Sequence, residues 1–160
     1  MTKTQLQYFE YVHQHIINVN KALVWLQEHG LADERYDFGM HDESKFWEEE
    51  FYDYADYFYG EGKSVDEAWL RHIYENPHHF QHWCLIEDSG QIKALPMPDI
   101  YLVEMICDWM SFSIIQNNLY EVFDYYEKNK SNMILHPETR AKVEELLGKI
   151  KEILDSEAEV

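Results

Sequence analysis

The sequence predicts an all-α fold, a bundle of about six to seven helices with one short β-hairpin near residues 84–97. Apolar residues recur at spacings of three and four along several segments, most clearly at Phe9, Val12, Ile16, Val19, Leu23 and Leu26. Residues typical of helix starts and stops separate these segments. Only the region 84–97 is strand-like, with apolar runs on either side of Asp88-Ser89-Gly90.

The helix boundaries follow from local signals. Gly30 is typical of a C-cap, Ser64 and Glu67 form a capping box, and Asn76-Pro77 predicts an N-cap followed by the first helical position. The acidic residues Glu48, Glu49 and Glu50 are expected to face water. We therefore expect helices over 4–29, 42–59, 64–74, 78–83, 98–115, 119–128 and 137–154, and a frayed tail over 155–160.

Length and composition favour one domain spanning residues 1–160. The chain is 46% hydrophobic, which is enough to form a core, and it contains no repeat or linker-like segment. Its two cysteines, Cys84 and Cys107, form no CxxC motif and are expected to be free thiols. Neither a signal peptide nor a membrane span is recognisable, so we expect a cytoplasmic protein without membrane association.

The charge limits the partners. The formal charge is −18, from 13 basic and 31 acidic residues, so long nucleic acids are disfavoured as ligands. A small phosphorylated compound is still compatible, because bound divalent ions change the local field. A solvated acidic surface is a simpler interpretation of the charge than a DNA mimic.

Histidines and aspartates recur in a pattern typical of a metal site on a helix bundle. His41 and Asp42 are adjacent, and imidazole nitrogen and carboxylate oxygen are ligands that divalent transition metals prefer. Upstream, His13 and His15 project roughly 160° apart on their helix, so only one of them can serve the same site. Asp42 is equally well suited to be a helix N-cap. Lys45 lies on the same side as Asp42 and is either a phosphate contact or a surface lysine.

Further candidate ligands follow downstream. Four histidines fall within eleven residues: His72, His78, His79 and His82. We prefer His72 and His79, which flank the break at Asn76-Pro77, although His82 could chelate together with His78 or His79. Glu104 and Asp108 lie one turn apart on an apolar helix, where a buried carboxylate needs a partner such as a metal ion or an imidazolium. A salt bridge explains Glu104 equally well.

The order of these residues along the chain, His…His-Asp…Asp, resembles that of the HD-domain superfamily of metal-dependent phosphohydrolases. The resemblance covers roughly residues 8–145 and rests on His15-x-x-x-Val19, then Met40-His41-Asp42-Glu43-Ser44-Lys45, then Asp108. It implies an HD-like bundle in which His15, His41, Asp42 and Asp108 hold one divalent ion. Dinuclear members add two histidines between the adjacent His-Asp pair and the last aspartate. In this chain, His72 and His79 (or His78) lie in that interval.

Two other segments, 76–83 and 104–109, also look like an uncharacterised HD-like family of bacteria and phages. The chain departs from the superfamily pattern at Ser44, where HD enzymes often have glycine. Superfamily nucleotidases often use a glutamate shortly after the doublet as general acid. Here that neighbourhood offers Lys45, with Glu43, Glu48 and Glu49 nearby.

The resemblance implies a hydrolase of a small phosphorylated compound, such as a nucleotide, that uses metal-activated water. The cofactor would be one or two ions of Mn, Fe, Ni, Co or Zn. Lys45 and one histidine of the 72–82 cluster, for which we choose His79, would stabilise charge on the phosphoryl oxygens. Glu43 is a further catalytic candidate, and the identity of the general acid stays open. Trp47, Tyr52 or Trp83 could stack on a base, although each is better explained as a core residue.

Three alternatives remain. The same superfamily contains mixed-valent di-iron oxygenases, which would need six ligands, including His72 and His79. The acidic charge is compatible with a non-catalytic, phage-type binding or inhibitor protein on an HD-like scaffold. A purely structural bundle leaves the histidine cluster unexplained. Aromatic residues in 51–59 could also form a homodimer face or belong to the core.

Overall fold

The structure, a computed structural model, describes residues 1–62 and 64–159. Within this part, the chain forms six α-helices and one short antiparallel sheet, which confirms the predicted all-α bundle with a hairpin. In chain order the elements are α1 Lys3–Glu28, the 3₁₀ turn η1 Glu43–Phe46, α2 Glu48–Tyr59, α3 Asp66–Glu75, the 3₁₀ turn η2 Phe80–Trp83, β1 Cys84–Ile86, β2 Ile92–Ala94, α4 Asp99–Ile115, α5 Glu121–Asn129 and α6 Pro137–Ala158.

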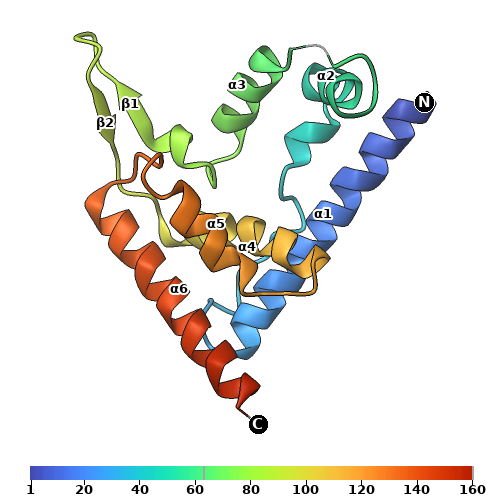
Figure 1. Cartoon of the computed structure of the whole chain (residues 1–160). Helices are drawn as coiled ribbons and strands as arrows, with labels where there is room; N and C mark the ends of the chain where they lie inside the picture. Colours follow the sequence, from blue (N-terminus) through green and yellow to red (C-terminus); the bar gives the residue numbers. More distant parts are fainter. Residues whose placement is uncertain (63, 160) are drawn as a thin grey trace.

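The long helices α1 and α6 diverge like the arms of a V, with α4 and α5 between them (Figure 1). The helix α4 packs along α1 and also contacts α5 and α6. Its side chains are apolar on most sides, as expected for a helix with neighbours all round. The larger hydrophobic cluster lies here and includes Val19, Leu26, Ile106, Met110 and Ile150, which are all buried.

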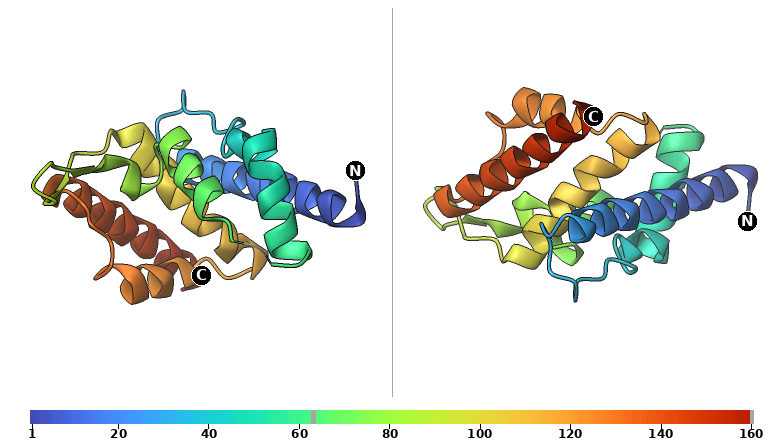
Figure 2. Two further views of the ribbon diagram at one scale, coloured as in Figure 1. Left: turned by 90° about the horizontal axis from the view of Figure 1, so that it is seen from above. Right: turned by 90° about the horizontal axis from the view of Figure 1, so that it is seen from below.

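A smaller hydrophobic cluster lies where α2 and α3 pack near the N-terminal end of α1 (Figure 2). Tyr8 and Val12 of α1 contribute to it, together with Phe51 and Tyr54 of α2. Along α1, Val12 belongs to this cluster and Val19 to the larger one. The buried His15 therefore lies at the boundary between the two clusters.

The region expected as one helix over 42–59 is interrupted. Residues 43–46 form the turn η1, Trp47 has an extended backbone, and α2 begins only at Glu48. Asp42 has a left-handed backbone (φ 56°, ψ 24°), and its side chain makes no capping hydrogen bond. Asp42 is thus the N-cap residue of η1 by position, but its carboxylate does not cap the turn and contacts histidines and Lys45 instead.

Other local signals were also misread. The helix α3 begins at Asp66, and Ser64 accepts a hydrogen bond from the Asp66 N–H without closing a capping box. Asn76 is the C-cap of α3, and the expected helix over 78–83 is only the turn η2, because the Asn76 side chain bonds back to His72 and Ser44.

The remaining elements lie close to their expected positions. The hairpin is confirmed, and its strands pair in register, with Cys84 opposite Ala94 and Ile86 opposite Ile92. The last helix continues to Ala158, so the fraying expected from residue 155 is not seen there, and residue 160 lies outside the described residues. Within the described part, every helix is too short or too polar to cross a membrane.

Candidate metal centre

Asp42 lies at the centre of a buried cluster of histidines. Its side chain is 2% exposed, and its two carboxylate oxygens face different partners. Oδ2 lies 3.6 Å from Nε2 of both His15 and His41. Oδ1 lies 3.2 Å from Nε2 of His72 and 3.4 Å from Nε2 of His78. The left-handed backbone at residue 42 is one that aspartate tolerates better than most residues other than glycine.

The first donor group consists of His15, His41 and Asp108, whose ligand atoms lie within 4.8 Å of one another. Nε2 of His15 is 3.1 Å from Oδ1 of Asp108 and 3.3 Å from Nε2 of His41. His15 comes from α1 and Asp108 from α4, and the packing of these two helices brings them together. Oδ2 of Asp42 completes this side of the centre.

The second donor group consists of Asp42, His72, His78 and His79, again with ligand atoms within 4.8 Å of one another. Nε2 of each histidine and Oδ1 of Asp42 are buried and have no hydrogen-bond partner among the described residues. Four such atoms in one place would be costly, because buried polar groups are normally paired. A metal ion bound between them would satisfy all four at once.

Hydrogen bonds behind the first donor group fix which ring nitrogen is free. Ser111 Oγ donates to the Asp108 carbonyl oxygen, so it can only accept from Nδ1–H of His15 at 3.2 Å. Nδ1 of His41 lies 2.8 Å from Oε1 of Glu104, a carboxylate that can only accept. Both histidines therefore carry the proton on Nδ1 and direct an Nε2 lone pair into the centre.

The second donor group has similar support. Nδ1 of His72 lies 3.0 Å from Oε2 of Glu50, and both side chains are fully buried. Ser44 donates a hydrogen bond to the same Glu50 oxygen, and Asn76 donates one to Ser44. Nδ1 of His78 lies 3.5 Å from Glu104. Carboxylates that hold the outer nitrogen of a metal-ligating histidine raise its basicity and orient its ring.

His41, His78 and Glu104 also form a third set with metal-like spacing. In this set, the Glu104 carboxylate faces Nδ1 of both His41 and His78. Nδ1 is the ring nitrogen that carries the proton, so it is not the nitrogen that would bind a metal ion. Since these contacts already pair an N–H with a carboxylate, we interpret the third set as support for the two donor groups.

The electrostatics of the centre favour positive charge. Burial alone would raise the pKa of Asp42, but Lys45 and His41 hold that pKa well below its usual range. Burial would lower the pKa of His78, yet the nearby carboxylates of Asp42 and Glu104 raise it to about 10, so a divalent cation would have to displace a proton from this imidazole. Burial, reinforced by His78 and His72, lowers the pKa of His79 and keeps this imidazole neutral. Ionised carboxylates and a neutral imidazole are the forms that bind a divalent cation.

The structure brings together all six residues that the sequence suggested as ligands: His15, His41, Asp42, His72, His79 and Asp108. It adds His78, so the alternative between His78 and His79 is resolved with both side chains in the second donor group. His13 is exposed and stacks on Phe9, whereas Nδ1 of His82 contacts the Ile73 carbonyl oxygen.

The residues expected to assist catalysis lie at different distances from the centre. Nζ of Lys45 is 2.6 Å from Oδ2 of Asp42, but Glu43 is exposed on the turn η1. His79 contributes a donor atom to the second donor group. Glu50 was expected to face water and is fully buried instead, because it binds His72. No local signal distinguished Glu50 from the neighbouring glutamates.

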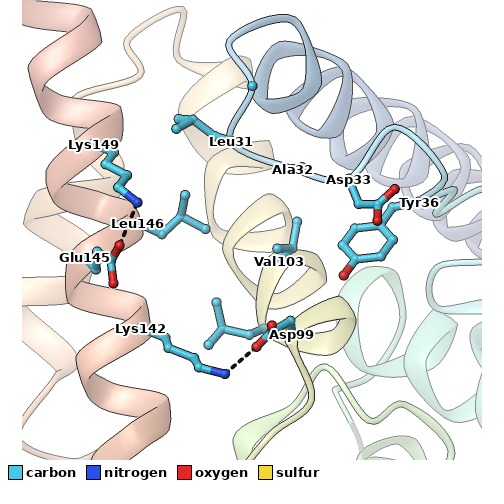
Figure 3. Close-up of a pocket in the computed structure, with 12 residues that line it drawn as sticks. Leu31, Ala32, Asp33, Tyr36, Asp99, Val103, Lys142, Glu145, Leu146 and Lys149 are labelled. Carbon is cyan, nitrogen blue, oxygen red and sulfur yellow. Dashed lines mark hydrogen bonds and ion pairs between the residues drawn. The ribbon is translucent and has the colours of Figure 1, made fainter.

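Two cavities adjoin the centre. One, of about 260 Å³, is lined by His78, His79 and Asp108, together with aromatic residues. The other, also of about 260 Å³, borders His41, His78 and Glu104. A separate cavity of about 330 Å³ lies between α6, α4 and the end of α1, where Lys142 and Lys149 pair with Asp99 and Glu145 (Figure 3). None of the candidate ligands lines that third cavity.

Comparison with known proteins gives a family without an assigned activity. No curated protein and no solved structure matches the chain. One family model, described as a family of unknown function (DUF5662), matches residues 4–149, which include every candidate ligand. The chain therefore belongs to the DUF5662 family.

Proposed function

We propose that the protein is a metal-dependent phosphohydrolase of a small phosphorylated compound, with two ions that share the carboxylate of Asp42. One observation carries the proposal. Four buried donor atoms of the second donor group have no hydrogen-bond partner in the described part of the chain, and the other oxygen of the same Asp42 carboxylate faces the first donor group. The resemblance to HD-domain phosphohydrolases supports the reaction class.

The donor atoms limit which metals suit the centre. The two groups together offer five imidazoles and two carboxylates. Such nitrogen-rich sets suit Mn, Fe, Co, Ni or Zn, whereas Ca²⁺ and Mg²⁺ prefer oxygen ligands. Cys84 and Cys107 belong to neither donor group. A transition metal is therefore the proposed cofactor.

Bound divalent ions would supply a hydroxide nucleophile near neutral pH and neutralise phosphoryl oxygens. The chain itself adds Lys45, whose burial would lower its pKa but whose contact with Asp42 raises it. The ammonium group therefore stays charged beside the centre and can donate hydrogen bonds to a phosphoryl oxygen. His15, His41 and His72 are held in one orientation by Ser111, Glu104 and Glu50.

The test combines metal content with phosphate release. Protein purified without a nickel column would be analysed for bound metals and assayed against a panel of phosphate monoesters, including nucleotides. The key variant is Asp42→Asn, because asparagine tolerates the left-handed backbone and removes only the charge. Asp53→Asn, the same change on the exposed face of α2, is the matched control.

We expect about two equivalents of metal and phosphate release in the wild type and in Asp53→Asn, and neither in Asp42→Asn. Helical circular dichroism retained in Asp42→Asn would show that the loss is local. Bound metal without phosphate release from any compound would overturn the proposed reaction and leave the metal centre standing. Tight nucleotide binding without turnover would instead favour the acidic binding protein.

The size of the donor set favours one second candidate, a di-iron oxygenase. The seven donor residues exceed the six ligands that such a centre requires. Reconstitution with iron under anaerobic conditions, followed by spectroscopy on exposure to O₂, distinguishes the two. A hydrolase would release phosphate with several metals and show no O₂-dependent change.

A further inference from the structure

The aromatic cavity beside the centre has the features of a binding site for a flat ring. This cavity of about 260 Å³ is lined by Trp69 of α3, Phe80 and Gln81 of η2, Trp109 of α4 and Tyr125 of α5. Its lining also includes Asp108 of the first donor group, and His78 and His79 of the second. The cavity is therefore the place where aromatic side chains and both donor groups meet.

The aromatic residues of the lining come from three different helices and the turn η2. The Trp69 ring centroid lies 5.1 Å from that of His79 and 5.8 Å from that of His72, so this ring covers the second donor group. The ring centroids of Trp109 in α4 and Tyr125 in α5 lie 5.6 Å apart. Trp69 and Tyr125 are 39% and 44% exposed, which leaves their rings accessible. Exposed aromatic faces of this kind bind planar rings by stacking.

Gln81 supplies a polar group to the same cavity. Its Oε1 atom is buried and has no hydrogen-bond partner among the described residues. An unpaired buried acceptor is unfavourable unless a ligand or a water supplies the missing donor. An N–H group on the edge of a ring would satisfy it, as would a hydroxyl group, so the preference for a ring comes from the aromatic lining.

The second cavity, which borders Glu104, is less suitable. There, the lining includes His41, His78 and Glu104, and the Nδ1 atoms of both histidines already lie close to the Glu104 carboxylate. In contrast, Asp108 and His79 line only the aromatic cavity, and both offer a ligand atom to the donor groups. The volume of the aromatic cavity lies just below the roughly 300–1,000 Å³ typical of sites for drug-sized ligands. One ring with its immediate substituent therefore fits better than a dinucleotide.

We propose that the aromatic cavity binds the base of a nucleoside monophosphate, with an N–H of the base directed to Gln81 Oε1. Asp108, His78 and His79 form the side of the cavity that faces the donor groups, so the phosphate lies toward them. The assignment rests on the proposed phosphohydrolase function and specifies its substrate class. Base binding itself requires neither the metal nor turnover, so it can be measured separately.

The experiment titrates free nucleosides and ribose into the full-length protein and follows binding by calorimetry. Nucleosides lack the phosphate, so their binding reports the aromatic cavity and not hydrolysis. We expect nucleosides to bind and ribose not to bind. Trp69→Ala should weaken nucleoside binding about tenfold or more, as removal of one stacking side chain typically does. Gln81→Leu should weaken binding of nucleosides with an edge N–H more than that of N-methylated analogues.

The matched control is Trp47→Ala. Trp47 is 41% exposed, close to the 39% of Trp69, but it does not line the cavity. Its loss should leave nucleoside binding unchanged. Weaker binding in Trp47→Ala with unchanged binding in Trp69→Ala would overturn the assignment, as would equal binding of nucleosides and ribose.

Failure of this assignment can be told apart from failure of the proposed function. Phosphate release from ribose 5-phosphate as fast as from nucleoside monophosphates would refute the base site and keep the hydrolase. Nucleoside binding that depends on Trp69, without phosphate release from any compound, would support the base site and refute the hydrolase.

Discussion

The two donor groups lie on different kinds of scaffold. His15 and Asp108 of the first group belong to α1 and α4, two long helices that pack along each other beside the larger hydrophobic cluster. In the second group, His72 lies in the last turn of α3, and His78 and His79 lie in the connection to η2. Long helices thus hold two of the three residues of the first group, with His41 in the turn before η1, whereas a short connection holds two of the three histidines of the second group.

The groups also differ in how well their polar atoms are paired. In the first group, Nε2 of His15 lies 3.1 Å from Oδ1 of Asp108 and 3.3 Å from Nε2 of His41, so each of these atoms has a polar contact. In the second, the Nε2 atoms of all three histidines lack hydrogen-bond partners among the described residues. An ion bound at the second group would offset the burial of its unpaired donors, so metal binding should matter most there.

The largest effects should come from the ligands themselves. We expect His15→Gln and His78→Gln each to lose one equivalent of metal while keeping the other, because the two residues belong to different groups. Activity should fall by more than the roughly 10–100-fold typical of outer hydrogen-bond partners. Elemental analysis and phosphate release measure both effects. Loss of both ions in either variant would show that the groups do not bind independently.

Removal of metal should affect the two scaffolds unequally. If metal is present at about 100 times its Kd, the ion contributes roughly 2.7 kcal/mol, which corresponds to a Tm change of about 5–10 °C for a chain of this size. We expect chelation, which removes both ions, to lower Tm by at least this amount. Hydrogen exchange should increase in the segment Asp66–Trp83, which carries the second group, and remain slow in α4. A uniform increase along the chain would contradict the difference between the groups.

A smaller effect is expected at Glu50, the buried partner of His72. Glu50→Gln keeps an acceptor for Nδ1 of His72 but removes its charge, so metal affinity of the second group should fall about tenfold, at the low end for such partners. Calorimetric titration with the metal measures this. The neighbouring Glu49→Gln is the matched control, because Glu49 is exposed and should have no effect. An equal loss of metal affinity at both donor groups would show that Glu50 affects metal binding through the overall fold and not through His72.

This comparison also explains what the sequence could and could not predict. The helices α1, α4 and α6 have long apolar periodicities set by local spacing, and they were placed nearly at their observed bounds. His15 and Asp108 lie on α1 and α4, so their convergence follows from helix packing. His78 and His79 are adjacent in an irregular turn, where no periodicity indicates which side chain faces inward.

Two further features depended on tertiary contacts. Glu50 stands in a run of three glutamates, and its burial follows from the positions of His72 and Ser44, which are distant in sequence. Aspartate is a residue type preferred at N-caps, but the Asp42 carboxylate contacts residues from several other segments. These contacts override the local preference for capping. Long-range hydrogen bonds of this kind leave no pattern in the neighbouring residues.

The smallest effect is expected at Ser111, the outer partner of His15. Ser111→Ala removes a neutral acceptor from Nδ1–H of His15, and neutral hydrogen bonds are weaker than the charge-assisted bond that Glu50 makes. We expect metal affinity of the first group to fall by only a few-fold, since α1 and α4 still hold His15 and Asp108 together, and unfolding free energy to fall by about 1 kcal/mol. Ser113→Ala, another buried serine of α4, is the control for the loss of a hydroxyl. If Ser111→Ala lowers metal affinity more than Glu50→Gln does, the first group depends more on its hydrogen bonds than on the packing of α1 and α4.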